Sequence, residues 1–260
     1  MSKKVINNKS IDFQVFDVHI HFGEYKGHFF APESINETLT FCGVHRFSVM
    51  LFPNKLNLNT ERDKWLNTKI LEQNSSVDLL LVVSPELLMV DDNLSILDTL
   101  PYKMIKLHGA LHSWHPNGKA IRKVFQIAKG KHIPIMLHTG GREKSDAGSY
   151  LNICADFPEV RVILAHSRPF DETLKVMKMC PNVWADTSFL PIEKVKLFDR
   201  EGLIDRVLFG TDFPIATYFS NETNPQTWYD KTISKMMAAL GVGTFKIISN
   251  VNYINFYHRY

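Results

Sequence analysis

Residues 104–138 read MIKLHGALHSWHPNGKAIRKVFQIAKGKHIPIMLH, and this stretch decides the fold. Its two apolar runs, 104–107 and 133–137, lack strict polar alternation, which is typical of strands buried on both faces. The segment 117–131 between them has helical periodicity and ends in Lys-Gly-Lys. The apolar side of this predicted helix comprises Ala120, Val124, Ile127 and Ala128. The stretch therefore predicts a strand–helix–strand unit with parallel strands.

The same pattern recurs along the whole chain. Further apolar runs occupy residues 13–18, 46–52, 78–84, 161–165, 183–186 and 206–209. Polar, helix-like segments separate them, and the segment 31–34 (Ala-Pro-Glu-Ser) is typical of a helix start with proline in its first turn. Eight such units predict an α/β fold, a closed (β/α)8 TIM barrel, as a single domain over residues 1–260. A doubly wound open sheet is the alternative.

The composition restricts the kinds of partner and compartment. The 260 residues are 45% hydrophobic and carry a formal net charge of +3, which favours neither nucleic acid nor an anionic membrane as partner. No apolar run reaches the roughly 20 residues of a membrane span. Residues 1–10 have charge but no apolar core after it, unlike a secretory signal. Three widely spaced cysteines fit a reducing compartment, so we expect a cytoplasmic protein.

Histidines and an aspartate follow four of the predicted strands. His19 and His21 follow the first strand, and alternation along a strand points both side chains the same way. His138, His166 and Asp212 follow three other strands. Because barrel active sites lie at the carboxyl ends of the strands, we expect these groups to converge at one mouth. Imidazole nitrogens with a carboxylate oxygen suit a divalent ion such as zinc.

Simpler interpretations of the single residues stay open. A lone His-x-His motif is weak support for a metal, and Asp212 alone could cap the following helix. The groups could also form a hydrogen-bonded network without a metal. Four imidazoles and one carboxylate together are harder to explain in this way, because burying them is costly unless they bind a cation or are fully hydrogen-bonded.

The phrases around these residues resemble one known family. They are FDVHIHFG at 16–23, IPIMLHTG at 133–140, VILAHS at 162–167, PNVWADTS at 181–188 and LFGTDFP at 208–214. They are similar to the amidohydrolase superfamily, and within it to the amidohydrolase-related branch that contains aminocarboxymuconate-semialdehyde decarboxylase and many hydrolases. The resemblance extends from about residue 13 to residue 260.

The resemblance implies a role for each of the five residues. His19, His21, His138 and Asp212 would hold a divalent metal, preferably zinc, that activates a water. Asp212 would accept the proton of that water and pass it to the leaving group. His166 would polarise the substrate carbonyl or stabilise the oxyanion. In members with two metals, His138 and His166 hold the second ion.

Lys106, at the end of the fourth predicted strand, decides between one metal and two. Two-metal amidohydrolases place a bridging ligand there, either a carboxylated lysine or a glutamate. An ammonium beside a dication is repulsive, so a ligand at this position would have to be deprotonated or carboxylated. Alternatively, Lys106 pairs with a substrate carboxylate or an acidic neighbour. We favour one metal over two.

Four residues at the same face are expected to contact substrate. His108 shares the face of Lys106 by alternation. The loop 109–118 carries His112 and Trp114, which form either a substrate wall or, for Trp114, packing over the adjoining helix. Arg168 either binds an anionic substrate or makes a salt bridge at a helix start.

We therefore expect an enzyme that hydrolyses a C–N or C–O bond of a small carbonyl substrate through a metal-activated water. The first alternative is a metal-dependent, non-oxidative decarboxylase of an unsaturated or aromatic acid, because the same metal cup serves both reactions. The second is a ligand-binding barrel without catalysis. The aromatic segment 253–260 packs on the barrel base or forms a contact in a homo-oligomer.

Overall fold

A ring of eight parallel strands forms the centre of the computed structural model, which describes residues 12–53 and 60–258. Each strand is hydrogen-bonded to the next in chain order, and the short β2 (His28–Phe30) pairs with the first strand as an antiparallel hairpin. The parallel strands are β1 (Val15–Tyr25), β3 (Val44–Leu51), β4 (Val77–Val82), β5 (Met104–Leu107), β6 (Ile135–His138), β7 (Val162–Ala165), β8 (Val183–Asp186) and β9 (Val207–Leu208). The eight predicted strands are confirmed.

Backbone hydrogen bonds join the segment after β9 to β1. The amide of Val18 donates to the carbonyl of Phe209 (2.9 Å), and the amide of His21 donates to that of Phe213 (2.7 Å). The sheet therefore closes on itself. This closure confirms the predicted (β/α)8 barrel, and the alternative prediction of an open doubly wound sheet is wrong. That residues 1–260 form a single domain stays a prediction.

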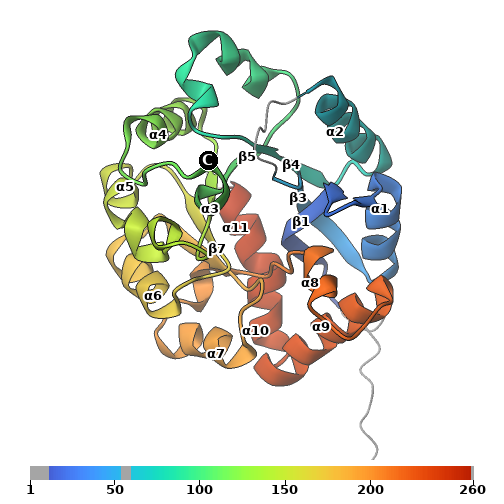
Figure 1. Cartoon of the computed structure of the whole chain (residues 1–260). Helices are drawn as coiled ribbons and strands as arrows, with labels where there is room; N and C mark the ends of the chain where they lie inside the picture. The colour runs from blue at the N-terminus through green and yellow to red at the C-terminus, as the bar shows by residue number, and fades with distance from the viewer. Residues whose placement is uncertain (1–11, 54–59, 259–260) are drawn as a thin grey trace, which may run out of the picture.

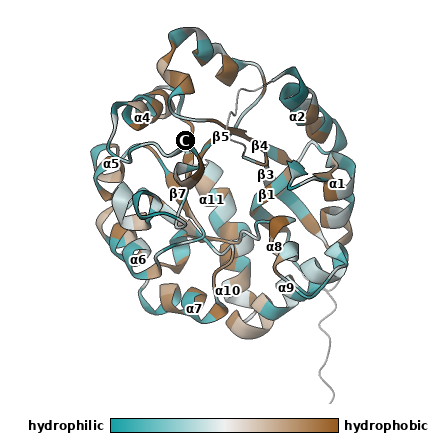
Figure 2. Ribbon diagram, viewed as in Figure 1, coloured by the Kyte–Doolittle hydropathy of each residue, from teal (hydrophilic) through white to brown (hydrophobic). Residues whose placement is uncertain are grey.

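Helices surround this ring, and α11 lies at its centre (Figure 1). Figure 2 shows hydrophobic and hydrophilic residues alternating along the outer helices. Their bounds are α1 (Pro32–Phe41), α2 (Glu61–Gln73), α4 (Lys119–Lys131), α5 (Leu151–Asp156), α6 (Phe170–Met179), α7 (Ile192–Arg200) and α9 (Pro225–Leu240), with the short α3 (Gly109–His112), α8 (Ile215–Tyr218), α10 (Val242–Lys246) and α11 (Asn252–His258). Short 3-10 helices lie at Leu87–Met89, Asp91–Asp98, Glu143–Ser145, Ala147–Tyr150 and Ile204–Arg206. Among the described residues, no helix is both long and apolar enough to cross a membrane.

The apolar face of α4 differs in detail from the predicted one. Its buried residues are Ile121, Val124, Phe125 and Ala128, whereas Ala120 and Ile127 are only half-buried. The buried set follows the i, i+3, i+4, i+7 spacing of one helix face. The buried face of α4 is therefore rotated by about one residue from the predicted face.

The barrel has two separate apolar cores. One lies between the strands and the outer helices and includes Ile105, Leu107 and Ile121. The other fills the barrel interior, with Met104 and Met136 from the strands. Residues that alternate along a strand therefore enter different cores, which explains why the strands read as continuous apolar runs.

The C-terminal helical segment closes the floor of the barrel. Tyr253 and Phe256 of α11 belong to the interior core, so the described part of the aromatic segment packs on the barrel base; residues 259–260 of the prediction lie outside the described part, as do residues 1–10. A π-helical turn, Ile247–Val251, precedes α11. There the carbonyl of Ile248 accepts a hydrogen bond from the amide of Phe209 (2.8 Å).

Asn252 fastens this helix to the strand layer. Its buried side-chain amide donates to the carbonyls of Ile204 (2.8 Å) and Val207 (2.6 Å). We expect Asn252→Ala to lower the free energy of unfolding by about 1–3 kcal/mol, because the half-buried carbonyl of Ile204 and the carbonyl of the buried Val207 lose their donor. Urea denaturation measures this loss. Ile254→Ala, at a site on the same helix that is 40% exposed, is the control; equal losses in both variants would contradict the role of Asn252.

Candidate functional site

A bulge in β1 directs His19 into the barrel. The pairing advances by three residues on β1, from Asp17 to Ile20, but by only two on β3. The extra residue lets both Val18 and His19 face the interior, although they are neighbours in sequence. His21 then regains the inward direction by ordinary alternation.

Left-handed backbone conformations bring two further groups to the mouth. Ala165 belongs to the interior core, so alternation alone would send the next side chain outward. His166 has φ +70° instead, and Asp212 has φ +57°. Such values are uncommon for residues other than glycine. These two turns let side chains that follow β7 and β9 reach the site.

The buried side chains of His19, His21 and Asp212 meet at the mouth. Nε2 of His19 lies 3.2 Å from Nε2 of His21, and Oδ1 of Asp212 lies 3.2 Å and 3.0 Å from these two nitrogens. Among the described residues, Oδ1 of Asp212 finds no hydrogen-bond donor of suitable geometry. The separations match the roughly 3.3 Å between ligand atoms that each lie about 2.0 Å from a tetrahedral zinc ion.

The charges of this cluster suit a cation. Burial lowers the pKa of His21 to about 4, so its imidazole is neutral near pH 7. Burial acts to raise the pKa of Asp212, but His19, His21 and Lys106 outweigh it and hold that pKa below its usual value. The cluster therefore presents a carboxylate beside a neutral imidazole, which is the protonation that metal binding requires.

Asp186, at the end of β8, orients His19. Its Oδ2 lies 2.6 Å from Nδ1 of His19, and both side chains are fully buried. A carboxylate accepts the Nδ1 proton, so the lone pair of His19 is on Nε2 and faces the cluster. Asp186 lies within the family phrase at 181–188, but it was not predicted to be a site residue. An aspartate ending a buried strand was the signal that could have found it.

A hydrogen-bond chain fixes the ring of His166. Ser188, another residue missed from the sequence, donates from Oγ to Asp186 (2.7 Å) and lies 2.8 Å from Nδ1 of His166. Because the hydroxyl proton goes to the carboxylate, Oγ must accept the Nδ1 proton of His166. Nε2 of His166 is then an acceptor, 3.1 Å from Nδ1 of His138. The lone pair of His138 is consequently on its own Nε2.

Two groups of described residues offer metal-ligand atoms within 4.8 Å of one another. They are His19, His21 and Asp212, and His19, His166 and Asp186. His138 belongs to neither group. The structure thus gathers three of the four predicted ligands in one set, and places His138 beside it through His166.

Asp17 joins the two segments that carry the ligands. It faces the outer layer, where it accepts hydrogen bonds from the backbone amide of His19 (2.8 Å), the hydroxyl of Thr211 (2.7 Å) and the hydroxyl of Tyr229 (2.5 Å). Burial raises its pKa to about 6. Asp17 lies within the family phrase at 16–23, but this role was not predicted for it.

Lys106 and His108 line the wall beneath α3. Nζ of Lys106 is buried, 3.4 Å from Nε2 of His19, and burial lowers its pKa to about 8. The ring of His108 stacks on that of His138 with centroids 3.7 Å apart and planes 14° apart. Both lysine and histidine therefore lie within the site, as alternation along β5 predicted.

The other expected substrate contacts are less central. Arg168 is exposed, with its guanidinium 5.3 Å from the ring centre of Phe189. His112 is half-buried at the end of α3. Trp114 is only 3% exposed and packs near Tyr150, which favours packing over a substrate wall.

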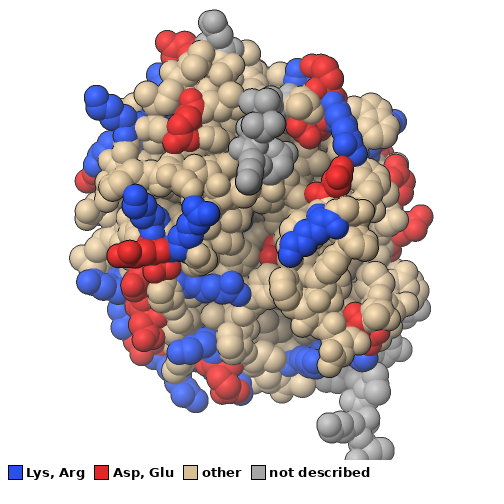
Figure 3. Space-filling view, in the orientation of Figure 1, with Lys and Arg blue, Asp and Glu red and all other residues tan. Residues whose placement is uncertain are grey.

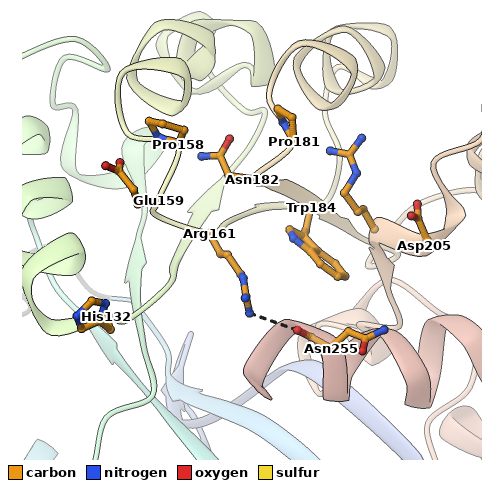
Figure 4. Close-up of a pocket in the computed structure, with 10 residues that line it drawn as sticks. His132, Pro158, Glu159, Arg161, Pro181, Asn182, Trp184, Asp205 and Asn255 are labelled. Carbon is orange, nitrogen blue, oxygen red and sulfur yellow. Dashed lines mark hydrogen bonds between the residues drawn. The ribbon is translucent and has the colours of Figure 1, made fainter. Parts of the chain in front are cut away.

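The mouth and the floor of the barrel differ in chemistry. Figure 3 shows a hollow near the centre of the face that carries α3 and α8, with basic side chains on both sides. A cavity of about 800 Å³ lies at the opposite end, between the starts of β7 to β9 and α11. In Figure 4, Arg161 reaches from this cavity to the carbonyl of Asn255. None of the candidate ligand residues lines it, so we place the chemistry at the mouth.

Solved structures with the same fold are hydrolases and decarboxylases. A probable 2-pyrone-4,6-dicarboxylic acid hydrolase from Acinetobacter baumannii, with citric acid bound, is 13% identical (TM-score 0.71; 95% of this chain and 100% of that chain covered). 5-Carboxyvanillate decarboxylase from Sphingomonas paucimobilis is 9% identical (TM-score 0.67; 94% and 99%). Dihydroorotase from Campylobacter jejuni is 14% identical (TM-score 0.61; 99% and 87%). At these identities the likeness shows the fold alone.

A match to a family model identifies the family, which the structural likenesses alone do not. No curated protein matches the sequence. The family model described as "Amidohydrolase" matches residues 88–235, which is more than half of the 260 residues. The chain therefore belongs to the amidohydrolase family.

Proposed function

We propose that the protein is a metal-dependent hydrolase that cleaves a C–N or C–O bond in a small carbonyl substrate. His19, His21 and Asp212 would hold a divalent ion, preferably zinc, and Nε2 of His138 would complete the set. When bound, such an ion supplies an activated water for attack on a carbonyl. Family membership and the hydrolase fold relatives support an enzyme.

One observation carries the proposal. A lone pair of His19, fixed by Asp186, points at Nε2 of His21 and at a buried carboxylate oxygen of Asp212 that lacks a hydrogen-bond donor. Lone pairs that face one another at 3.0–3.2 Å repel unless a proton or cation lies between them. A proton on Nε2 of His21 would bridge to only one of its two neighbours, whereas a cation would satisfy all three atoms.

The residues of the site divide the remaining tasks. Asp212 is a carboxylate at neutral pH, so it would accept the proton of the attacking water and return it to the leaving group. His166 uses its Nδ1 proton on Ser188, so its task would be to position His138 or to ligate a second ion. Arg168 would attract an anionic group of the substrate.

Metal removal and a product assay test the proposed reaction. We expect purified protein to contain zinc or manganese, to lose activity on treatment with a chelator and to regain it with added zinc. The assay follows ester, lactone and amide hydrolysis in parallel with carbon dioxide release. Carbon dioxide without hydrolysis would make the protein a decarboxylase, like its 5-carboxyvanillate relative. A protein that binds neither metal would contradict the catalytic proposal.

Gly210 tests the geometry of the ligand cluster. A Cβ at this position would lie 3.1 Å from Cβ of His19 and 3.2 Å from Cβ of Asp186. We expect Gly210→Ala to displace this pair and weaken zinc binding by about 10- to 100-fold, as other changes behind metal ligands do. Competition with a chromogenic chelator measures the affinity.

The matched control is Gly130→Ala in α4. There a Cβ would meet nothing within 4 Å, and alanine favours a helix. This variant should bind zinc as the unaltered protein does. Unchanged zinc affinity in Gly210→Ala would show that the metal is held elsewhere.

Lys106 distinguishes one bound metal from two. Its ammonium lies near a ligand nitrogen, so we expect Lys106→Gln to bind zinc roughly tenfold more tightly, because a like charge is removed. The zinc content should stay at one ion per chain in both proteins. Metal analysis in the presence of bicarbonate checks this. Two ions in the unaltered protein and one in Lys106→Gln would instead identify Lys106 as a carboxylated bridging ligand.

A further inference from the structure

The ring of His108 has its two nitrogens in different surroundings. His108 directly precedes α3, and its Nδ1 accepts a hydrogen bond from the amide of Leu111 (3.2 Å). An amide can only donate, so Nδ1 must carry the lone pair and the ring proton must be on Nε2. The backbone of α3 thus fixes one tautomer of this histidine.

The position of the ring places it beside the ligand cluster. Met104 faces the barrel interior and Lys106 the ligand cluster, so alternation along β5 brings His108 to the same side. The stack on His138 holds the ring against a candidate ligand. Within the described residues, no hydrogen-bond partner is assigned to Nε2 of His108, and this atom is not among the fully buried ones.

Three other rings of the cluster offer no comparable donor. His19 gives its Nδ1 proton to Asp186, and His166 gives its own to Ser188. His138 donates from Nδ1 to His166. His19 and His138 therefore keep only a lone pair for the site, and the lone pair of His166 already accepts the proton of His138.

We propose that Nε2–H of His108 is a fixed hydrogen-bond donor of this site, which binds the carbonyl or carboxylate oxygen of the substrate. The inference rests on the proposed hydrolase function and assigns to His108 the oxyanion-stabilising task that the family resemblance gave to His166. It also excludes His108 as a metal ligand, because an Nε2 ligand would force a proton onto Nδ1, facing the amide of Leu111. The substrate class is one with an oxygen acceptor beside the bond that is cleaved.

Two substitutions test the two nitrogens of His108 separately. Nε2–H is the proposed donor to the substrate, and Nδ1 caps α3 by accepting a hydrogen bond from the amide of Leu111. Asparagine places an oxygen near the position of Nδ1 and is a favoured residue before a helix, so His108→Asn keeps the cap but loses the donor. Glutamine places an NH2 group near the position of Nε2, so His108→Gln keeps the donor but loses the cap. A residue that acts only on structure would rank the two variants in the opposite order.

The zinc-loaded variants are compared on 4-nitrophenyl acetate and by urea unfolding. We expect His108→Asn to unfold at the same urea concentration as the unaltered protein but to lose about 100-fold in kcat, the usual cost of removing one oxyanion donor. His108→Gln should unfold at lower urea but stay within about tenfold in kcat. Activity that follows stability, with asparagine above glutamine, would overturn the proposal.

The tautomer of His108 can be measured by NMR without any enzymatic turnover. In 15N spectra of the histidine rings, the signals absent from His108→Gln should show a protonated Nε2 and an unprotonated Nδ1. A proton on Nδ1 would overturn the inference. If the zinc-loaded protein hydrolyses no ester, lactone or amide, the proposed function fails, while these spectra still decide the tautomer.

Discussion

The hydrogen bond between Asp186 and His19 is the interaction on which the site depends. It joins the end of β8 to the middle of β1, which are far apart in sequence, at 2.6 Å and without any contact with solvent. The second carboxylate oxygen of Asp186 accepts hydrogen bonds from the amide of His166 and from the hydroxyl of Ser188. One carboxylate therefore sets both the direction of the lone pair on His19 and the tautomer of His166, so the two ends of the cluster are oriented together.

Tautomers, more than distances, assign the tasks of the five rings. Neutral imidazole has one donor and one acceptor, so each hydrogen bond behind a ring determines what the ring shows to the site. The carboxylate behind His19 leaves a lone pair on Nε2, which suits a cation, whereas the lone pair of His166 accepts the proton of His138. A backbone amide behind His108 leaves a proton, which suits an oxygen atom. In the proposed site, one side-chain type would therefore bind a metal and a substrate oxygen side by side.

The strands and the residues at their ends could be predicted from the sequence because two simple regularities hold in barrels of this kind. Apolar runs without alternation indicate buried parallel strands, and active sites follow their carboxyl ends. Periodicity could not predict local departures of the backbone from regular strand geometry. The extra residue in β1 and the left-handed conformation of His166 both break strict alternation, and both occur where chemistry is expected. The outward Asp17 and the inward Asp186 look alike in sequence, and only the fold separates their roles.

The π-helical turn before α11 affects when the barrel can form. The carbonyl of Ile248 is the partner of the amide of Phe209, which directly precedes the close contact of Gly210 with His19. During synthesis, the strand β9 leaves the ribosome well before residue 248 does. Until then that amide has no partner, and the contact between β9 and β1 lacks its support from below. We therefore expect the ligand cluster to be among the last parts of the molecule to become ordered on the ribosome.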